Sequence, residues 1–334
     1  MNKPTPSAPE SRHDTTSTPR NALLNATHTS SRFDLRAWSA TQLAAIEKAL
    51  SVWVACPEAA PAPAGLGNAM RYAVLDGGKR LRPLLVMAGC EAIGGDSHAA
   101  MRPACAVELI HAYSLVHDDM PCMDNDVLRR GKPTVHVQFG EAQALLAGDA
   151  LQALAFEILT PEDGSMAHAT QAQLCRMLAL AAGFQGMAGG QAIDLASVGM
   201  PLDTEQLHRM HRLKTGALLQ ASVMMGATCG TTPLPVTVMA ALQGYGAALG
   251  LAFQVVDDIL DVTADSAILG KTAGKDAAQD KPTFVTLMGL EASRDYAQQL
   301  LRRALTSLDP LERAELGNTH ALHALADMLV NRQH

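Results

Sequence analysis

The sequence predicts an all-α protein, a single large helical bundle of about ten or more helices around a central cavity. The composition is 48% hydrophobic but only 4% aromatic, and alanine, leucine, methionine and glycine dominate where strands would favour valine, isoleucine, threonine and tyrosine. Apolar residues also recur at intervals of three and four from Asp34 onward, as in Leu35, Trp38, Leu43 and Ile46. This spacing is typical of one face of a helix.

Glycine and proline mark where we expect one helix to end and the next to begin, because both are unfavourable inside a helix. The marks are Gly77–Gly78, Gly94–Gly95, Pro121, Pro133, Pro161, Gly189–Gly190, Pro201, Pro233, Pro235, Gly270 and Pro282. Two segments between them, at about 98–119 and 236–262, carry almost no charge until their C-terminal ends. A helix that is apolar on every side is a central one, so we expect these two to face each other across the cavity.

The chain divides into two regions by composition. Residues 1–32 are rich in Ser, Thr, Pro and Asn, and we expect a disordered tail there. An organelle transit peptide is the alternative, although Glu10, Asp14 and several prolines disfavour it. Residues 33–334 contain no linker-like stretch and are expected to form one domain.

Charge and cysteine usage limit the possible functions. The formal net charge of −7 argues against nucleic-acid binding. The six cysteines form no C-x-x-C pair, which is typical of reduced thiols in a cytoplasmic protein. We expect no membrane-spanning segment.

An aspartate cluster ends each of the two apolar segments. The six carboxylates are Asp118, Asp119, Asp124, Asp257, Asp258 and Asp261. Charge at the end of an apolar helix is costly unless it is paired, and several hard oxygen ligands suit Mg²⁺, which usually keeps positions open for substrate phosphates. Asp257 and Asp261 share one helix face, and Pro121 would loosen the first helix end so that Asp124 can turn back toward Asp118. The clusters therefore predict a site for Mg²⁺ and a diphosphate.

Basic residues lie at expected helix junctions in a matching number. They are Lys79, Arg80 and Arg82 within Gly77–Pro83, Arg129, Arg130 and Lys132 after the first cluster, and Lys214, Lys271 and Lys281. Arginine binds diphosphate oxygens through two donors, while lysine acts as a point charge. The set as a whole favours two polyanions bound close together, although Lys132 alone is better explained as surface charge.

Five motifs together resemble the short-chain trans-isoprenyl diphosphate synthase family. They are Gly-Gly-Lys-Arg-x-Arg-Pro at 77–83, Asp-Asp-x4-Asp followed by Arg-Arg-Gly at 118–131, Gly-Gly-Gln-x-x-Asp at 189–194, Lys214-Thr215, and Phe-Gln-x-x-Asp-Asp-x-x-Asp at 253–261. The resemblance covers roughly 33–334, which it identifies as a polyprenyl synthase catalytic domain with the isoprenoid synthase fold. It implies a homodimer that joins isopentenyl diphosphate to allylic diphosphates.

The resemblance also implies a role for each motif residue. Asp118, Asp124, Asp257 and Asp261 would bind three Mg²⁺ per active site, with Asp119 and Asp258 alongside and with Mn²⁺ as a possible substitute. Arg129, Lys214, Lys281 and Lys271 would hold the allylic diphosphate. Gly78, Lys79, Arg82, His111 and Arg130 would hold isopentenyl diphosphate. Catalysis would rest on Lys214, Thr215, Gln254 and Arg129, which favour ionisation of the allylic C–O bond and present oxygen dipoles to the cation.

Within the family the sequence is most similar to bacterial farnesyl diphosphate synthases, which stop at fifteen carbons. The discriminating positions are Tyr113, five residues before Asp118, and its neighbour Ser114, where a bulky phenol resembles the farnesyl type. The alternative is a synthase of the twenty-carbon geranylgeranyl diphosphate, because the two-residue insertion Pro121-Cys122 is found with both products.

Rival classes explain less of the sequence. Glu108-x-x-His111 and Glu205-x-x-His208 have the pattern of a di-iron carboxylate bundle, but that function leaves the aspartate clusters and the cations unexplained. A terpene cyclase would need aromatic walls, which a chain with 4% aromatic residues lacks. A non-catalytic regulatory subunit should have lost an aspartate cluster, and both are present.

Overall fold

A computed structural model describes residues 33–55, 63–75, 77–200, 202–230, 233–263 and 283–332. The predicted tail at 1–32 and the boundaries at Pro201, Gly270 and Pro282 lie outside these residues, as do Lys271 and Lys281. The division of the chain at residue 32 therefore stays a prediction.

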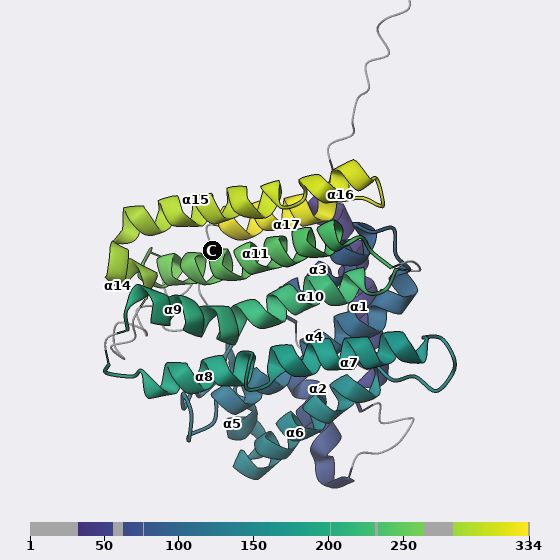
Figure 1. Cartoon of the computed structure of the whole chain (residues 1–334). Coiled ribbons are helices and arrows are strands. Elements are labelled where there is room, and N and C mark those ends of the chain that lie inside the picture. The colour runs from purple at the N-terminus through teal and green to yellow at the C-terminus, as the bar shows by residue number, and fades with distance from the viewer. Residues whose placement is uncertain are drawn as a thin grey trace, which may run out of the picture. The chain divides into compact units, whose positions relative to one another are not determined.

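The described residues fold as helices joined by short turns (Figure 1), which confirms the all-α prediction. The first half contains α1 (Leu35–Trp53), a 3₁₀ turn (Pro63–Gly65), α2 (Leu66–Leu75), α3 (Leu81–Glu91), α4 (Ser97–Asp118), β1 (Leu128–Arg129), β2 (Lys132–Pro133), α5 (Val135–Phe139), α6 (Glu141–Glu157) and α7 (His168–Ala182). The second half contains α8 (Met187–Ala196), α9 (Thr204–His211), a π-helical segment (Arg212–Gly216), α10 (Ala217–Ala227), α11 (Val236–Thr263), α14 (Phe284–Met288), α15 (Leu290–Thr306), α16 (Asp309–Ala314) and α17 (His320–Val330).

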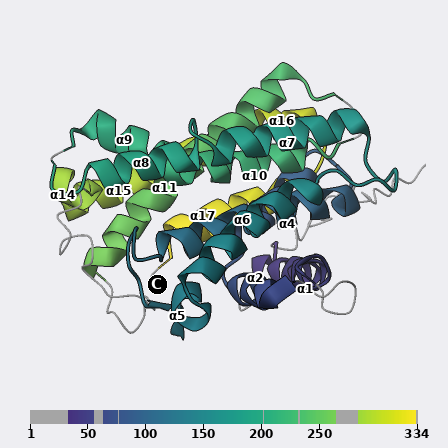
Figure 2. The same ribbon diagram turned by 90° about the horizontal axis from the view of Figure 1, so that it is seen from below.

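The two predicted central helices are present almost as expected. α4 and α11 each begin and end within one residue of the predicted limits. α4 packs mainly against α6 and α3, and α11 lies between α15 and α10. Figure 2 shows α4 and α6 side by side from below. Both helices therefore pack their apolar sides within the bundle, and their C-terminal ends carry the aspartates.

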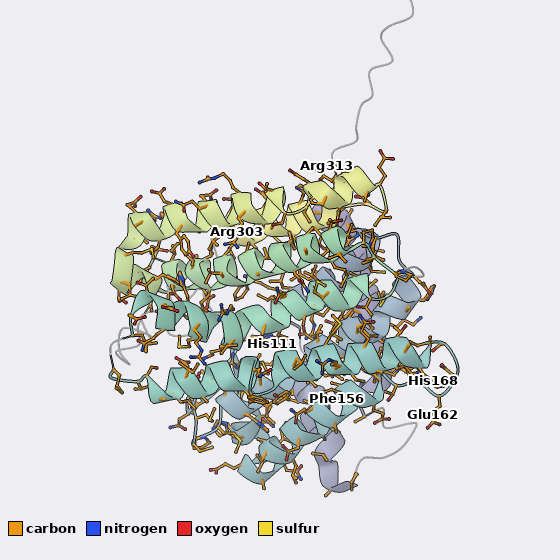
Figure 3. The ribbon with its side chains drawn as sticks, viewed as in Figure 1. His111, Phe156, Glu162, His168, Arg303 and Arg313 are labelled. Atoms are coloured by element: carbon orange, nitrogen blue, oxygen red, sulfur yellow. The ribbon has the colours of Figure 1, made fainter. Side chains whose placement is uncertain are left out.

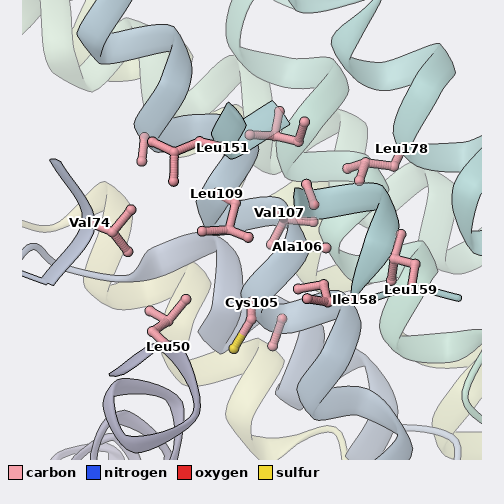
Figure 4. Packing of buried hydrophobic residues seen from close by; sticks show 14 of the residues in the cluster. Leu50, Val74, Cys105, Ala106, Val107, Leu109, Leu151, Ile158, Leu159 and Leu178 are labelled. Atoms are coloured by element: carbon pink, nitrogen blue, oxygen red, sulfur yellow. The ribbon is translucent and has the colours of Figure 1, made fainter. Parts of the chain in front are cut away.

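The core forms two hydrophobic clusters, one around each central helix. The first joins α4 to α6, α7 and the N-terminal helices, and includes Leu109, Leu151 and Leu178 (Figure 4). The second surrounds α11 and includes the fully buried Tyr245, whose hydroxyl donates to the carbonyl of Leu322 at 2.7 Å. Burial of this extent holds the helix ends in fixed positions, because a protein core is close-packed.

By length and composition α11 could cross a membrane, and it is the one helix of the described residues that could. The expectation that no segment spans a membrane therefore stays a prediction. About half of the apolar stretch is buried inside the protein, as for a central core helix, so the helix contributes to the interior of the bundle.

Two local features differ from the expected pattern. Gly189 and Gly190 do not end a helix but lie inside α8. The chain after the first aspartate cluster forms a short antiparallel hairpin in which Arg129 pairs with Lys132. Both differences bear directly on the site.

Candidate active site

The first aspartate cluster folds back on the end of α4. The helix ends at Asp118, and the backbone N–H of Asp124 returns to donate to the carbonyl of Asp118 at 2.8 Å. The turn contains Pro121, as the sequence predicted. Burial raises the pKa of Asp118 to about 6, Lys214 opposes this shift, and Asp124 adds to it. A carboxylate in this position gains from a nearby cation.

Asp119 forms an ion pair with Arg129. Arg129, on β1, donates from Nε to Oδ2 at 2.8 Å and from Nη2 to Oδ1 at 2.5 Å. Asp119 is only 2% exposed, so the pair forms in a desolvated place. Although burial opposes it, the hydrogen bonds to Asp119 raise the pKa of Arg129, and the guanidinium stays charged. The hairpin therefore holds Arg129 at the first cluster.

The three aspartates of α11 have three different environments. Asp258 is 2% exposed and accepts from Gln254 Nε2 at 2.9 Å and from the backbone N–H of Phe284 at 2.8 Å. Asp261 is 5% exposed. Asp257 is more open and lies 3.4 Å from Nη2 of Arg332. In this stretch of α11, Asp258 therefore faces the protein interior, while Asp257 faces Arg332.

Arg332 is a site residue that sequence reasoning missed. Its guanidinium lies 4.6 Å from the centre of the Phe253 ring, and its Nε is buried without a hydrogen-bond partner. Burial lowers the pKa of Lys79, and the nearby charge of Arg332 lowers it further while Asp257 opposes the shift. Arg332, Lys79 and Asp257 are therefore neighbours. A single arginine near the chain end carries no local pattern that could reveal this.

Lys214 and Thr215 link the two aspartate clusters. Both lie in the π-helical segment, a form that often occurs at functional sites. Lys214 Nζ forms an ion pair with Asp194 Oδ2 of α8. Burial opposes a charged lysine, but Asp194 raises the pKa of Lys214, and Asp118 and Asp124 add to the shift. Thr215 Oγ1 donates to Gln254 Oε1 at 3.3 Å, so the same segment also contacts α11.

Gly190 has no side chain because α8 passes directly over Lys214. A Cβ atom on Gly190 would lie 2.1 Å from the backbone N of Lys214. We expect Gly190→Ala to lower stability by about 1–3 kcal/mol, as overpacking does, and to lower kcat at least about tenfold by displacing Lys214. Thermal melts and steady-state kinetics measure the two effects.

The control for this change is Gly216→Ala in the same segment. A Cβ atom there would meet nothing closer than 3.6 Å, so we expect stability and kcat close to those of the parent. If Gly190→Ala is as stable and as active as Gly216→Ala, the close packing of α8 on Lys214 does not position it.

The glycine-rich loop before α3 holds another part of the site. Gly77 and Gly78 have φ values of 88° and 133°, which favour glycine. The guanidinium of Arg130 donates from Nη1 to the carbonyl of Gly77, and a Cβ atom on Gly78 would lie 2.7 Å from the same nitrogen. The absence of a side chain at Gly78 therefore lets Arg130 lie against the loop that carries Lys79.

His111 and Arg82 lie near this loop, because the charges of Arg82 and Arg130 both act on His111. Burial lowers the pKa of His111 well below its usual value, and Arg82 and Arg130 lower it further. Burial also lowers the pKa of Arg82 to about 10, with Glu108 opposing the shift, and its Nε is buried without a partner. An unsatisfied guanidinium nitrogen beside a neutral imidazole suits an incoming anion. Figure 3 marks His111 among the side chains between the helices.

Arg80 does not join these cations at the site. It is 3% exposed and donates to Glu47 and Glu108, each at 2.7 Å. Glu108 therefore serves an arginine in the core. His208 stacks on Tyr296 with ring centres 5.7 Å apart. These contacts use both Glu-x-x-His segments for packing and give no support to a di-iron site.

The two positions linked to chain length lie on α4 near α6. Tyr113 is half-buried and packs edge-on against His117, with ring centres 5.7 Å apart. Ser114 donates to the carbonyl of His111 at 2.9 Å. A pocket of about 60 Å³ lies between α2, α4 and the hairpin, and its lining includes Asp119, Arg129 and Arg130 of the site.

The aspartates fit Mg²⁺ by their chemistry. The donor set is carboxylate oxygen, which suits a hard cation, and burial raises the pKa of Asp118, so a cation beside it would stabilise the charged form. Within the described ranges, no three His, Cys, Asp or Glu side chains form a metal-binding group as they stand. Mg²⁺ at this site would therefore be held by one or two carboxylates, with substrate phosphate oxygens and water as its other ligands.

A helical bundle with two aspartate-rich helix ends, opposed by arginines and lysines, defines a class of diphosphate-binding proteins. The chain belongs to the polyprenyl synthetase family, whose sequence profile matches residues 63–318. It is 52% identical over 249 residues to a probable farnesyl diphosphate synthase of Bradyrhizobium diazoefficiens, with 73% of each chain covered. It is 49% identical over 268 residues to the farnesyl diphosphate synthase of Escherichia coli, with 79% and 88% covered.

Solved structures agree with this assignment. The chain matches a geranyltransferase from Helicobacter pylori, complexed with magnesium and isoprenyl diphosphate, at a TM-score of 0.76 and 36% identity, with 90% of this chain and 97% of the other covered. It matches an FPP/GFPP synthase from Zymomonas mobilis at 0.75 and 42% identity, covering 89% and 98%. Geranylgeranyl pyrophosphate synthase 11 of Arabidopsis thaliana is also similar, at 46% identity over 282 residues, covering 83% and 77%.

Proposed function

We propose that this chain is a farnesyl diphosphate synthase, a prenyltransferase that condenses isopentenyl diphosphate with dimethylallyl and then geranyl diphosphate. The observation that carries the proposal is the π-helical segment, which places Lys214 near Asp118 and Asp124 and joins Thr215 to Gln254 of α11. The relatives named farnesyl diphosphate synthase support the fifteen-carbon product. The similarity to a geranylgeranyl synthase keeps the twenty-carbon product as the alternative.

Three Mg²⁺ would be held by Asp118, Asp124, Asp257 and Asp261, with Asp119 and Asp258 alongside. When bound, Mg²⁺ supplies positive charge that stabilises the departing diphosphate, and Mn²⁺ can substitute for it. The Helicobacter pylori relative complexed with magnesium and isoprenyl diphosphate supports this dependence. The arginine that contacts Asp257 would turn to a substrate oxygen when Asp257 binds metal.

Lys214 and Arg129 would bind the allylic diphosphate, together with Lys271 and Lys281. Both described cations already lie among aspartates, so they neutralise the charge that develops as the C–O bond breaks. Thr215 and Gln254 would direct their oxygens toward the carbon that becomes positive. A dry site is needed because water would otherwise capture that cation.

Gly78, Lys79, Arg82, His111 and Arg130 would bind isopentenyl diphosphate. Burial lowers the pKa of His111 most, and the surrounding arginines lower it further. Its ring is therefore neutral and can donate one hydrogen bond to an anion. The proton lost from isopentenyl diphosphate would pass to the released diphosphate. Because the diphosphate then acts as the base, the step needs no carboxylate or imidazole of suitable pKa.

Lys79→Ala and Arg130→Ala should raise the KM for isopentenyl diphosphate at least about tenfold, because each removes a charge-assisted contact worth about 1.5–3 kcal/mol. The KM for geranyl diphosphate should change much less. Steady-state kinetics with each substrate varied in turn measure both constants. The reverse pattern would show that the two substrate sites have been exchanged.

A test of the metal requirement needs only the purified protein. Turnover, measured as released diphosphate, should stop when a chelator is added and return with Mg²⁺ or Mn²⁺ but not with iron. Activity that survives exhaustive chelation would overturn the proposed mechanism.

We further propose that the protein is a cytoplasmic homodimer that binds no nucleic acid and spans no membrane. Leu145 and Leu146 of α6, Leu180 of α7 and Phe184 just after it are exposed, Phe184 to 83%. Exposed apolar residues on neighbouring helices suit an interface between subunits. Light scattering of the purified protein measures its mass, and a monomer at micromolar concentration would contradict the dimer.

A further inference from the structure

We infer that Asp258 is a positioning residue which couples the end of α11 to the start of α14, and that its side chain does not bind metal. The inference rests on the proposed function, because the residues it positions are those assigned to the allylic cation. It separates Asp258 from Asp257, although the two are adjacent in one motif.

The contacts of Asp258 face the protein interior. Both carboxylate oxygens accept hydrogen bonds, Oδ1 from Gln254 Nε2 at 2.9 Å and Oδ2 from the N–H of Phe284 at 2.8 Å. The side chain is 2% exposed. A carboxylate that already accepts two such bonds would lose both contacts by turning toward a metal, and a buried backbone N–H left without a partner is costly.

The same contacts fix the orientation of Gln254. Because Nε2 donates to Asp258, Oε1 is the atom that accepts from Thr215 Oγ1 at 3.3 Å. Asp258 therefore determines that Gln254 presents an oxygen, and not an N–H group, at the π-helical segment. An oxygen is the atom that a developing allylic cation requires, since the opposite amide orientation would place positive hydrogens there.

Packing fixes the start of α14, where the N–H of Phe284 donates to Asp258. Phe284 is fully buried, and its ring lies 5.4 Å from the ring of His211 and 5.1 Å from that of His208. Thr283 caps α14 by accepting from the N–H of Thr286. The buried ring and the cap fix the position of the Phe284 N–H. Its hydrogen bond to Asp258 then connects the start of α14 to α11.

Asp257 differs in each of these respects. Its side chain is 37% exposed, and its Oδ1 lies 3.4 Å from Nη2 of Arg332. The structure therefore provides a matched pair of adjacent aspartates for a test.

The test compares Asp258→Asn, Asp258→Ala and Asp257→Asn. In Asp258→Asn the new amide can accept from Phe284 N–H and donate to Gln254, whose own amide then reverses and donates to Thr215. Hydrogen bonds are kept, but the charge and the orientation of Gln254 change. In Asp258→Ala both bonds are lost. Asp257→Asn removes charge from the proposed metal site.

Two measurements distinguish the roles. Hydrogen exchange of a peptide covering 283–289, followed by mass spectrometry, should be unchanged in Asp258→Asn and at least about tenfold faster at the Phe284 amide in Asp258→Ala. The Mg²⁺ concentration for half-maximal turnover should stay within about threefold of the parent in Asp258→Asn and rise at least about tenfold in Asp257→Asn. In both Asp258 variants kcat should fall more than the KM for isopentenyl diphosphate rises.

If Asp258→Asn needs as much additional Mg²⁺ as Asp257→Asn does, Asp258 is a metal ligand and the inference fails. It also fails if the Phe284 amide is equally protected in Asp258→Ala. A parent protein that makes no prenyl diphosphate would instead overturn the proposed function, while the exchange result at Phe284 would still report on the coupling.

Discussion

Asp118→Asn should abolish turnover, with a loss of kcat of at least about a thousandfold, corresponding to about 4 kcal/mol of barrier stabilisation, while the protein stays folded. The change removes a proposed Mg²⁺ ligand without altering the shape of the side chain. Without metal, the Asp118→Asn variant should melt at the same temperature as the parent or higher. In the parent, burial and the neighbouring Asp124 disfavour the charged form of Asp118, and the variant has no such charge.

The loss should be specific to the site. Asp149→Asn changes an exposed aspartate on α6 and should leave kcat and melting unchanged, since surface substitutions have small effects. Adding Mg²⁺ with inorganic diphosphate should raise the melting temperature of the parent and of Asp149→Asn but not of Asp118→Asn. A folded Asp118→Asn variant with activity within about tenfold of the parent would rule out this residue as a ligand.

Tyr113→Ala should change the product from fifteen carbons to twenty or more. The residue lies about 7.5 Å from Asp118 along α4, taking 1.5 Å per residue, at a depth suited to the end of a growing prenyl chain. Its ring is half-buried and packs on His117. Removing it opens space below the site, so a fifteen-carbon product can stay bound as the next substrate. Chromatography of the dephosphorylated products gives their lengths.

Tyr113→Phe is the matched control for this prediction. It keeps the ring and loses only the hydroxyl, so the product should remain at fifteen carbons. The alanine variant should lose a few kcal/mol of stability at most, as other large-to-small changes do. If it still stops at fifteen carbons, Tyr113 does not form the floor of the cavity.

The sequence predicted the features that follow from strong local patterns. α4 and α11 are apolar on nearly every side and end in carboxylates, so periodicity and charge defined their limits to within one residue. The return of Asp124 to Asp118 followed from Pro121, which cannot continue a helix. The same length and apolar character made α11 resemble a membrane span, because composition does not tell which surface a helix packs against.

Features that depend on tertiary contacts could not be predicted in this way. Gly189 and Gly190 lie inside α8, where Gly190 packs against the backbone of Lys214 and Gly189 against the carbonyl of Phe184. Helix spacing separated Asp258 from Asp257 and Asp261, but it could not give the partners of Asp258, which are Gln254 and the backbone N–H of Phe284. Arg332 follows α17 and contacts Asp257 of α11. The residues around Arg332 form no motif that would predict this contact.

The central claim is that this site elongates allylic diphosphates to fifteen carbons. The direct measurement is incubation of the purified chain with Mg²⁺, labelled isopentenyl diphosphate and either dimethylallyl or geranyl diphosphate, followed by chromatography of the products. We expect farnesyl diphosphate as the main product from both allylic substrates. A main product of twenty carbons would contradict the farnesyl assignment, and no prenyl product from either substrate would contradict the proposed function itself.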